Sequence, residues 1–97
     1  MYQLDKLKAQ RKEIYKIARK HKVKKLYVFG SCARREETPK SDIDFIAEFG
    51  HGTDIVNHVK LEKRMARLLK RHVDVVSEGA LRNDSFERSV RQDMVEL

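Results

Sequence analysis

The stretch "FGSCARREETPKSDIDF", residues 29–45, holds two short signals that bear on fold and function together. A Gly-Ser pair, Gly30 and Ser31, ends one apolar run, and ten residues later Asp42 and Asp44 stand in a second one. Apolar runs rich in β-branched and aromatic residues and bounded by turn residues predict strands. Two carboxylates in such a strand need a physical reason, and the rest of the chain supplies the context for it.

The chain outside this stretch alternates between helical and strand patterns. Apolar residues at helical spacing predict one long amphipathic helix from Leu4 to about residues 21–24. The other expected helices are a short one that Ser31 caps, one over 53–72 that Thr53 caps, and one over 84–97. In helix 53–72, the positions expected to face inward are Ile55, Val59, Leu61, Met65, Leu68 and Leu69. The expected strands are 25–30, 42–49 and 73–77.

The order of these elements predicts a single α/β domain over residues 1–97. A full helix connects the second and third strands, so these two should be parallel neighbours with a right-handed crossover. The link between the first and second strands has only about a dozen residues, so this pair could be antiparallel. We therefore expect a small mixed three-stranded sheet with helices packed on it.

The two carboxylates share one face of the second strand, because residues i and i+2 point the same way. Like charges this close repel unless one is protonated or a cation lies between them. Carboxylates without a partner His or Cys suit a hard divalent ion such as Mg²⁺. Asp74, inside the third strand, would join Asp42 and Asp44 if the two strands are neighbours. Taken alone, an Asp-x-Asp pair or Asp74 could equally be a strand-edge carboxylate that faces water.

The Gly-Ser pair favours the metal-binding interpretation. Gly30 at a strand end allows a tight turn and a close approach of a backbone N–H group to an anion. Ser31 opens a helix, whose free N–H groups and hydroxyl can hold phosphate. A phosphate cradle that faces metal-binding carboxylates is what nucleotide chemistry requires.

Gly30-Ser31, ten residues, then Asp42-x-Asp44 resembles the GSx10DxD signature of the DNA polymerase beta-like nucleotidyltransferase superfamily. The segment "LYVFGSCARREETPKSDIDFIAEF" looks like the minimal nucleotidyltransferases (MNT), and the match extends through Asp74. Most members of this group are antitoxins encoded beside a HEPN-domain toxin. The resemblance implies a nucleotidyltransferase fold.

The resemblance also implies roles for residues. Asp42 and Asp44 would bind two Mg²⁺ ions, and Asp74 would hold one ion and activate the attacking hydroxyl. Gly30 and Ser31 would bind the triphosphate of ATP, with which Arg34 of the family's GSxAR stretch could also make contact. The implied activity is Mg²⁺-dependent transfer of AMP from ATP to a tyrosine of the partner HEPN toxin, which silences the toxin's RNase activity.

The family commonly has Gly where this chain has Arg35, and Arg tolerates a positive φ poorly. The sequence leaves the shape of that loop open. The four histidines show no ligand spacing with one another or with Cys32, so we expect helix-surface or packing roles for them. No His-Asp arrangement activates Cys32, which we expect to be structural.

The charge balance, 22 Lys and Arg against 15 Asp and Glu, would attract polyphosphate, RNA or an acidic protein. Aromatic residues do not alternate with the basic ones and no RNA-binding module is recognisable, so direct nucleic-acid binding is not expected. One cysteine indicates a reducing compartment. No apolar run approaches a membrane span, and the first residues lack the apolar core of an export signal. We therefore expect a cytoplasmic protein.

Two further functions stay open. One is a catalytically idle antitoxin that neutralises its toxin by binding alone. The other is the catalytic subunit of a small-molecule nucleotidyltransferase, which would need an acceptor-binding domain from elsewhere. The sequence does not identify the acceptor, the number of AMP units or the stoichiometry of a complex.

Overall fold

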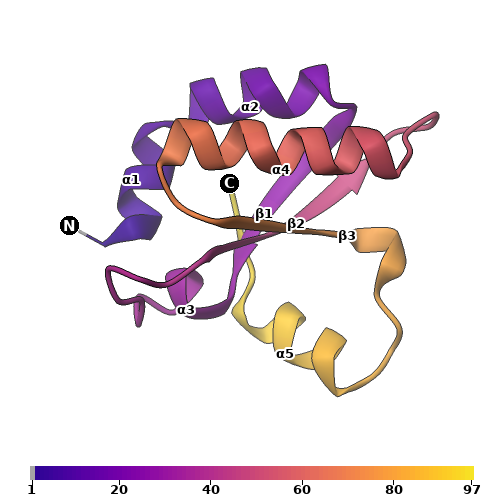
Figure 1. Cartoon of the computed structure of the whole chain (residues 1–97). Helices are drawn as coiled ribbons and strands as arrows, with labels where there is room; N and C mark the ends of the chain where they lie inside the picture. Colours follow the sequence, from indigo (N-terminus) through magenta and orange to yellow (C-terminus); the bar gives the residue numbers. More distant parts are fainter. Residues whose placement is uncertain (1) are drawn as a thin grey trace.

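The computed structural model describes residues 2–97, which form a four-stranded mixed sheet with helices on both sides (Figure 1). The strands lie in the spatial order β3-β2-β1-β4. Their bounds are β1 Val23–Phe29, β2 Ile43–Phe49, β3 Val73–Ser77 and β4 Val95–Glu96. β2 and β3 are parallel, whereas β1 is antiparallel to both of its neighbours. The predicted mixed sheet and the parallel β2–β3 pair are confirmed, and the predicted number of strands is wrong by one.

Two helices, α2 (Arg11–Lys20) and α4 (Ile55–Leu69), lie side by side over one face of the sheet. α5 (Ser85–Asp93) lies on the opposite side (Figure 1). α3 (Gly30–Ala33) follows β1 directly, and a 3-10 turn, η1 (Glu78–Ala80), follows β3. No helix in the described part of the chain is long and apolar enough to cross a bilayer.

The predicted long first helix is two helices. α1 (Gln3–Ala9) ends at Gln10, where the backbone leaves the helical region, and α2 starts at the next residue. Both helices bury apolar side chains, Leu4 and Leu7 from α1 and Ile14 from α2. The change of direction lets α1 contact α3 while α2 contacts β1 and α4. No Pro or Gly marks this position, so the sequence carried no signal for the break.

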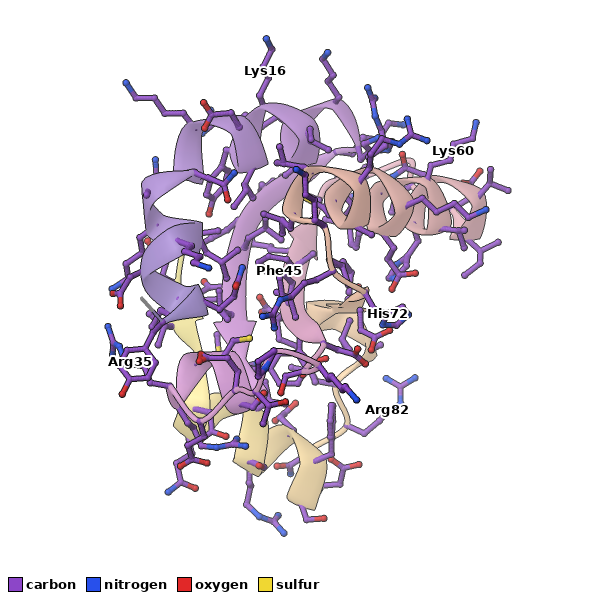
Figure 2. The ribbon with its side chains drawn as sticks, turned by 60° about the vertical axis from the view of Figure 1, so that its left-hand side comes forward. Lys16, Arg35, Phe45, Lys60, His72 and Arg82 are labelled. Atoms are coloured by element: carbon purple, nitrogen blue, oxygen red, sulfur yellow. The ribbon has the colours of Figure 1, made fainter. Side chains whose placement is uncertain are left out.

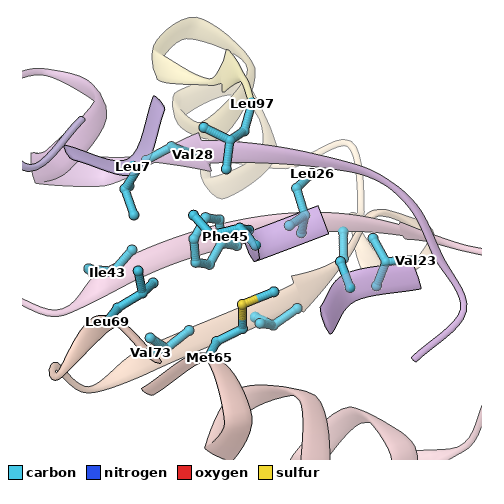
Figure 3. Packing of buried hydrophobic residues seen from close by; sticks show 14 of the residues in the cluster. Leu7, Val23, Leu26, Val28, Ile43, Phe45, Met65, Leu69, Val73 and Leu97 are labelled. Atoms are coloured by element: carbon cyan, nitrogen blue, oxygen red, sulfur yellow. The ribbon is translucent and has the colours of Figure 1, made fainter. Parts of the chain in front are cut away.

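The core lies between the sheet and the helices α2 and α4, with Phe45 of β2 at its centre (Figure 3). Phe45, Leu26 and Met65 are completely buried. Burying each such side chain stabilises the fold by about 1.5–3 kcal/mol. Ile43 and Phe45 share the core-facing side of β2, so Asp44 between them points to the other side of the sheet.

The second long helix begins later than predicted, and part of its apolar face is not buried. Asp54, not Thr53, is the N-cap, and its side chain accepts a hydrogen bond from the backbone N–H of Asn57 at 2.9 Å. Ile55 is 72% exposed and Val59 is 39% exposed, so the prediction that they face inward is wrong. Helical periodicity identifies the apolar face of a helix. It does not show how much of that face the sheet covers.

The predicted last helix over 84–97 is also wrong at its end. α5 stops at Asp93, and β4 adds two residues to the free edge of β1. The N–H of Leu97 donates to the carbonyl of Leu26 at 2.9 Å, and Arg11 Nε donates to the carbonyl of Leu97 at 2.6 Å. A strand of two residues has no period that a sequence pattern could reveal.

Candidate active site

The turn at Gly30 brings β1 and β2 into close contact. Gly30 has φ +73°, a conformation that glycine adopts without steric penalty. A Cβ atom at this position would lie 2.8 Å from Asp44 Oδ2, which is closer than real Cβ atoms approach. Only glycine therefore lets the chain turn while the Asp44 carboxylate lies against it.

The expectation that Ser31 caps α3 is wrong, because Ser31 is the second residue of this helix. Phe29 occupies the cap position with an extended backbone and no side-chain cap bond. Ser31 still lies in the first turn of the helix, next to the glycine.

The sheet register brings the predicted carboxylates together. Asp44 pairs with Phe29 of β1 on one side and with Asp74 of β3 on the other. Asp42 lies two residues before Asp44, at the entry to β2, where the N–H of Ile43 donates to the carbonyl of His72 at 3.0 Å. Neighbouring residues in a parallel pair point to the same face, so Asp44 and Asp74 face the same side of the sheet.

His72 joins this cluster, which corrects its expected helix-surface or packing role. Its Nδ1 lies 3.3 Å from Asp42 Oδ2 and 3.8 Å from Asp74 Oδ2. α4 ends at Leu69, so His72 stands on the short connection to β3 (Figure 2). Its position two residues before Asp74 could have indicated that His72 belongs to the site. That position is informative only when β3 is known to lie beside β2.

The electrostatics of the cluster are those of crowded carboxylates. Partial burial, together with the negative charges of Asp74 and Asp42, raises the pKa of Asp44 above its ordinary value. His72 and Arg34 act in the opposite direction but do not outweigh these effects. The site therefore favours an added positive charge.

The donor set fits a divalent cation. Asp42, His72 and Asp74 each offer a ligand atom, and these atoms all lie within 4.8 Å of one another. About half of each aspartate side chain remains exposed, so an ion from solvent can reach both. Carboxylate oxygens are the ligands of Mg²⁺, whereas an imidazole nitrogen is better suited to a transition metal such as Mn²⁺.

Arg34 is held by acidic neighbours. Its Nη1 donates to Asp93 of α5 at 2.6 Å and its Nε donates to Glu36 at 3.1 Å. These contacts tie α3 to α5 next to the carboxylates. A contact between Arg34 and phosphate, as the family resemblance implies, stays a prediction and would require an exchange of these partners.

Arg35, whose place in the loop the sequence left open, adopts φ +57°. The loop therefore makes a left-handed turn here although Arg35 carries a side chain. Arg35 Nη2 also donates to Asp5 of α1 at 3.2 Å, an exposed ion pair of small energetic value. Arg71, which follows α4, contacts the same loop farther along the chain. Its Nη1 donates to the carbonyls of Thr38 and Ser41 and so holds the segment that leads into Asp42.

Cys32 has a structural role, as expected. It is completely buried, and its thiol lies 3.6 Å from the carbonyl of Asp42, to which it can donate. Burial raises the pKa of the Cys32 thiol, which opposes formation of a reactive thiolate.

Comparisons with known proteins agree with this geometry. The family described as "Polymerase beta, Nucleotidyltransferase" matches residues 12–95. A relative from Methanocaldococcus jannaschii, provisionally named a protein adenylyltransferase, is 41% identical over 76 residues, which cover 78% of each chain.

Solved structures share the fold. One that is provisionally described as a minimal nucleotidyltransferase has a TM-score of 0.82 at 31% identity, and the match covers 97% of this chain and 95% of that one. Another is described as a tri-AMPylated Shewanella oneidensis HEPN toxin in complex with an MNT antitoxin. Its matching chain has a TM-score of 0.68 at 22% identity, with 99% of this chain and 71% of that one covered, and it shows the fold alone. From the family match and the 41% identical relative, we conclude that this chain belongs to the polymerase beta nucleotidyltransferase family, among its minimal nucleotidyltransferases.

Proposed function

We propose that this protein is a protein adenylyltransferase that acts as an antitoxin: it transfers AMP from ATP to a tyrosine hydroxyl of a HEPN-domain RNase toxin. One observation carries the proposal. Asp44 lies against the Gly30 turn and is paired in register with Asp74, whose carboxylate clusters with that of Asp42. The chain acts as a single minimal domain, residues 1–97, in the cytoplasm, where ATP is available and Cys32 stays reduced.

The chain's own residues would divide the work as follows. Gly30 and Ser31 hold the triphosphate at the start of α3. Asp42, Asp44 and Asp74 are the residues that would hold Mg²⁺, two ions by the family resemblance. When bound, Mg²⁺ neutralises negative charge on the phosphate oxygens.

The reaction is a displacement at phosphorus. The tyrosine oxygen attacks the α-phosphorus of ATP and forms a new P–O bond, while the bond from that phosphorus to the bridging oxygen of the β-phosphate breaks. Pyrophosphate leaves with the electron pair of the broken bond. The proton of the tyrosine hydroxyl passes to a carboxylate oxygen of Asp74, which acts as general base.

The position of Asp74 supports this role. It lies on β3, the edge strand, and its side chain is half-exposed. It lines a surface groove of about 290 Å³ together with residues of α4. An acceptor can therefore approach Asp74 from the open edge of the sheet, while Gly30 and Asp44 lie toward its interior strands.

The identity of the acceptor rests on relatives. A relative's provisional name supports transfer of an adenylyl group to protein, and a complex that contains an AMPylated HEPN toxin shares this fold. Both similarities favour a protein acceptor over a small molecule.

The test is co-expression with the product of the neighbouring gene, which the proposal expects to be a HEPN-domain protein. We expect the partner to gain mass by one or more AMP units, and we expect the gain to vanish with Asp42→Asn. Co-purification without a mass change, with full neutralisation by Asp42→Asn, would contradict the proposal and favour an antitoxin that acts by binding alone. Transfer to a small molecule and not to the partner would favour the small-molecule enzyme.

A further inference from the structure

The outer face of α4 exposes aliphatic side chains that no other part of the described chain covers. Ile55 is 72% exposed, Val56 is 56% exposed and Val59 is 39% exposed. The opposite face of the same helix carries Leu61 and Met65, which are completely buried. Adjacent exposed aliphatic residues are common at protein-binding surfaces.

Two lysines border these residues. Lys60 and Lys63 follow at helical spacing, are exposed, and have no ion-pair partner within 4.0 Å among residues 2–97. The single carboxylate of the helix, Glu62, accepts a hydrogen bond from the N–H of Val75 at 2.8 Å and makes no ion pair with either lysine within 4.0 Å. We refer to Ile55, Val56, Val59, Lys60 and Lys63 as the α4 strip, which lines a groove of about 340 Å³.

The α4 strip leads to the catalytic carboxylates. Val59 and Lys63 also line the groove of about 290 Å³ whose other wall includes His72 and Asp74. In Figure 2, Lys60 and His72 lie on the same side of the molecule. A polypeptide bound along the α4 strip would therefore reach the open side of Asp74.

We propose that the α4 strip docks an acidic, amphipathic segment of the acceptor protein. The aliphatic residues take its apolar face, and Lys60 and Lys63 pair with its carboxylates. This inference rests on the proposed function, because it assigns the route by which the tyrosine reaches Asp74. Docking next to the site raises the local concentration of the hydroxyl.

The chemistry of the α4 strip disfavours two other occupants. A second copy of this chain in a symmetric pair would place Lys60 and Lys63 near the same lysines of its partner, and such like-charge contacts are unfavourable. Single-stranded RNA is bound through aromatic side chains on which bases stack, and the strip contains only aliphatic ones.

A peptide titration tests the docking surface without any need for AMP transfer. The probe is a synthetic helical peptide with Leu at i, i+3, i+4 and i+7 and Glu on the flanks, and its control has Lys in place of each Glu. We expect the acidic peptide, but not the Lys peptide, to shift the amide NMR signals of residues 55–63 in the full-length protein. The affinity for the acidic peptide should fall as the salt concentration increases. Equal shifts from the Lys peptide, no shifts, or shifts confined to α1 and α2 would overturn the inference.

Kinetics with the HEPN-domain partner give the second test. The double variant Val56→Asp/Lys63→Glu should raise KM for the partner about tenfold or more, equivalent to about 1.4 kcal/mol, with unchanged affinity for an ATP analogue. Arg67→Glu is the matched control, since Arg67 lines a separate groove beside Ile17, and it should leave KM unchanged.

The outcomes separate the two proposals. Normal transfer with an unchanged KM in the double variant would overturn the docking surface and leave the proposed function intact. Absence of transfer by the wild-type protein, with specific binding of the acidic peptide at residues 55–63, would overturn the proposed function and leave the docking surface intact.

Discussion

Replacement of Gly30 by alanine should damage both the fold and the reaction, for separate reasons. The backbone there has φ +73°, and a left-handed conformation costs an L-residue about 1–2 kcal/mol. For a domain of this size each kcal/mol lowers Tm by about 4–8 °C. The new methyl carbon would also lie 2.8 Å from Asp44 Oδ2, so the carboxylate must move away. A displacement of about 1 Å can lower the rate about 100-fold.

Gly52 provides a matched control. It has φ +79°, and a Cβ atom there would lie 3.0 Å from Lys22 Nζ, the flexible end of a side chain. Gly52→Ala and Gly30→Ala should therefore lose similar stability in urea unfolding. Only Gly30→Ala should lose transfer of labelled AMP from ATP to the partner. Full transfer activity in folded Gly30→Ala would refute the role assigned to the contact between Gly30 and Asp44.

Three further predictions concern charge, capping and catalysis. Burial and the neighbouring carboxylates raise the pKa of Asp44, so the ionised form destabilises the metal-free fold. Without metal at neutral pH, Asp44→Asn should be more stable to urea than the wild type. This difference in stability should shrink as the pH falls through the raised pKa of Asp44 toward the pKa of an unfolded aspartate. A difference that stays constant with pH would contradict this. Lys70 caps the end of α4 with φ +55°, a conformation that favours glycine. In the same assay, Lys70→Gly should therefore raise stability by about 1 kcal/mol, whereas Lys70→Ala should not. Equal stability of the two variants would count against a strained cap. Asp74→Asn should lower turnover by orders of magnitude with a smaller effect on affinity for an ATP analogue, measured by steady-state kinetics and titration; equal losses in both would make Asp74 simply another metal ligand.

The arrangement of the site could be predicted from the sequence to a large extent, because strand geometry is regular. The two-residue period places Asp42 and Asp44 on one face, and the long helical connection makes β2 and β3 parallel neighbours. Together they predict that Asp74 comes near the pair, whereas the register that sets Asp74 directly beside Asp44 is seen only in the structure. The spacing between Gly30 and the Asp42–Asp44 pair is also visible in the sequence. The close contact between Gly30 and Asp44, which requires glycine, is seen only in the structure.

Features that depend on tertiary contacts could not be predicted. Gln10 breaks the first helix because α1 and α2 pack on different neighbours, and nothing in the local sequence encodes that. β4 exists because the chain end reaches the free edge of β1. The exposed Ile55 and Val59 match the period of a buried helix face, so only the structure separates these exposed positions from core positions.

Arg35 shows how a local rule can be overridden. The sequence rule disfavours arginine at a positive φ, yet the loop retains φ +57° there. The turn is fixed from both ends, by the N–H of Arg35 donating to the carbonyl of Cys32 and the N–H of Glu36 donating to the carbonyl of Ser31. The surrounding hydrogen bonds thus impose a conformation that the residue itself disfavours.

The central claim is that Asp42 and Asp44 drive nucleotide transfer to a protein acceptor. The most direct measurement is the transfer of label from α-labelled ATP to the purified HEPN-domain partner, with wild-type protein and with the double variant Asp42→Asn/Asp44→Asn. The account predicts Mg²⁺-dependent labelling by the wild type and none by the double variant, which should remain folded and still bind the partner. Unchanged labelling by the folded double variant would contradict the account.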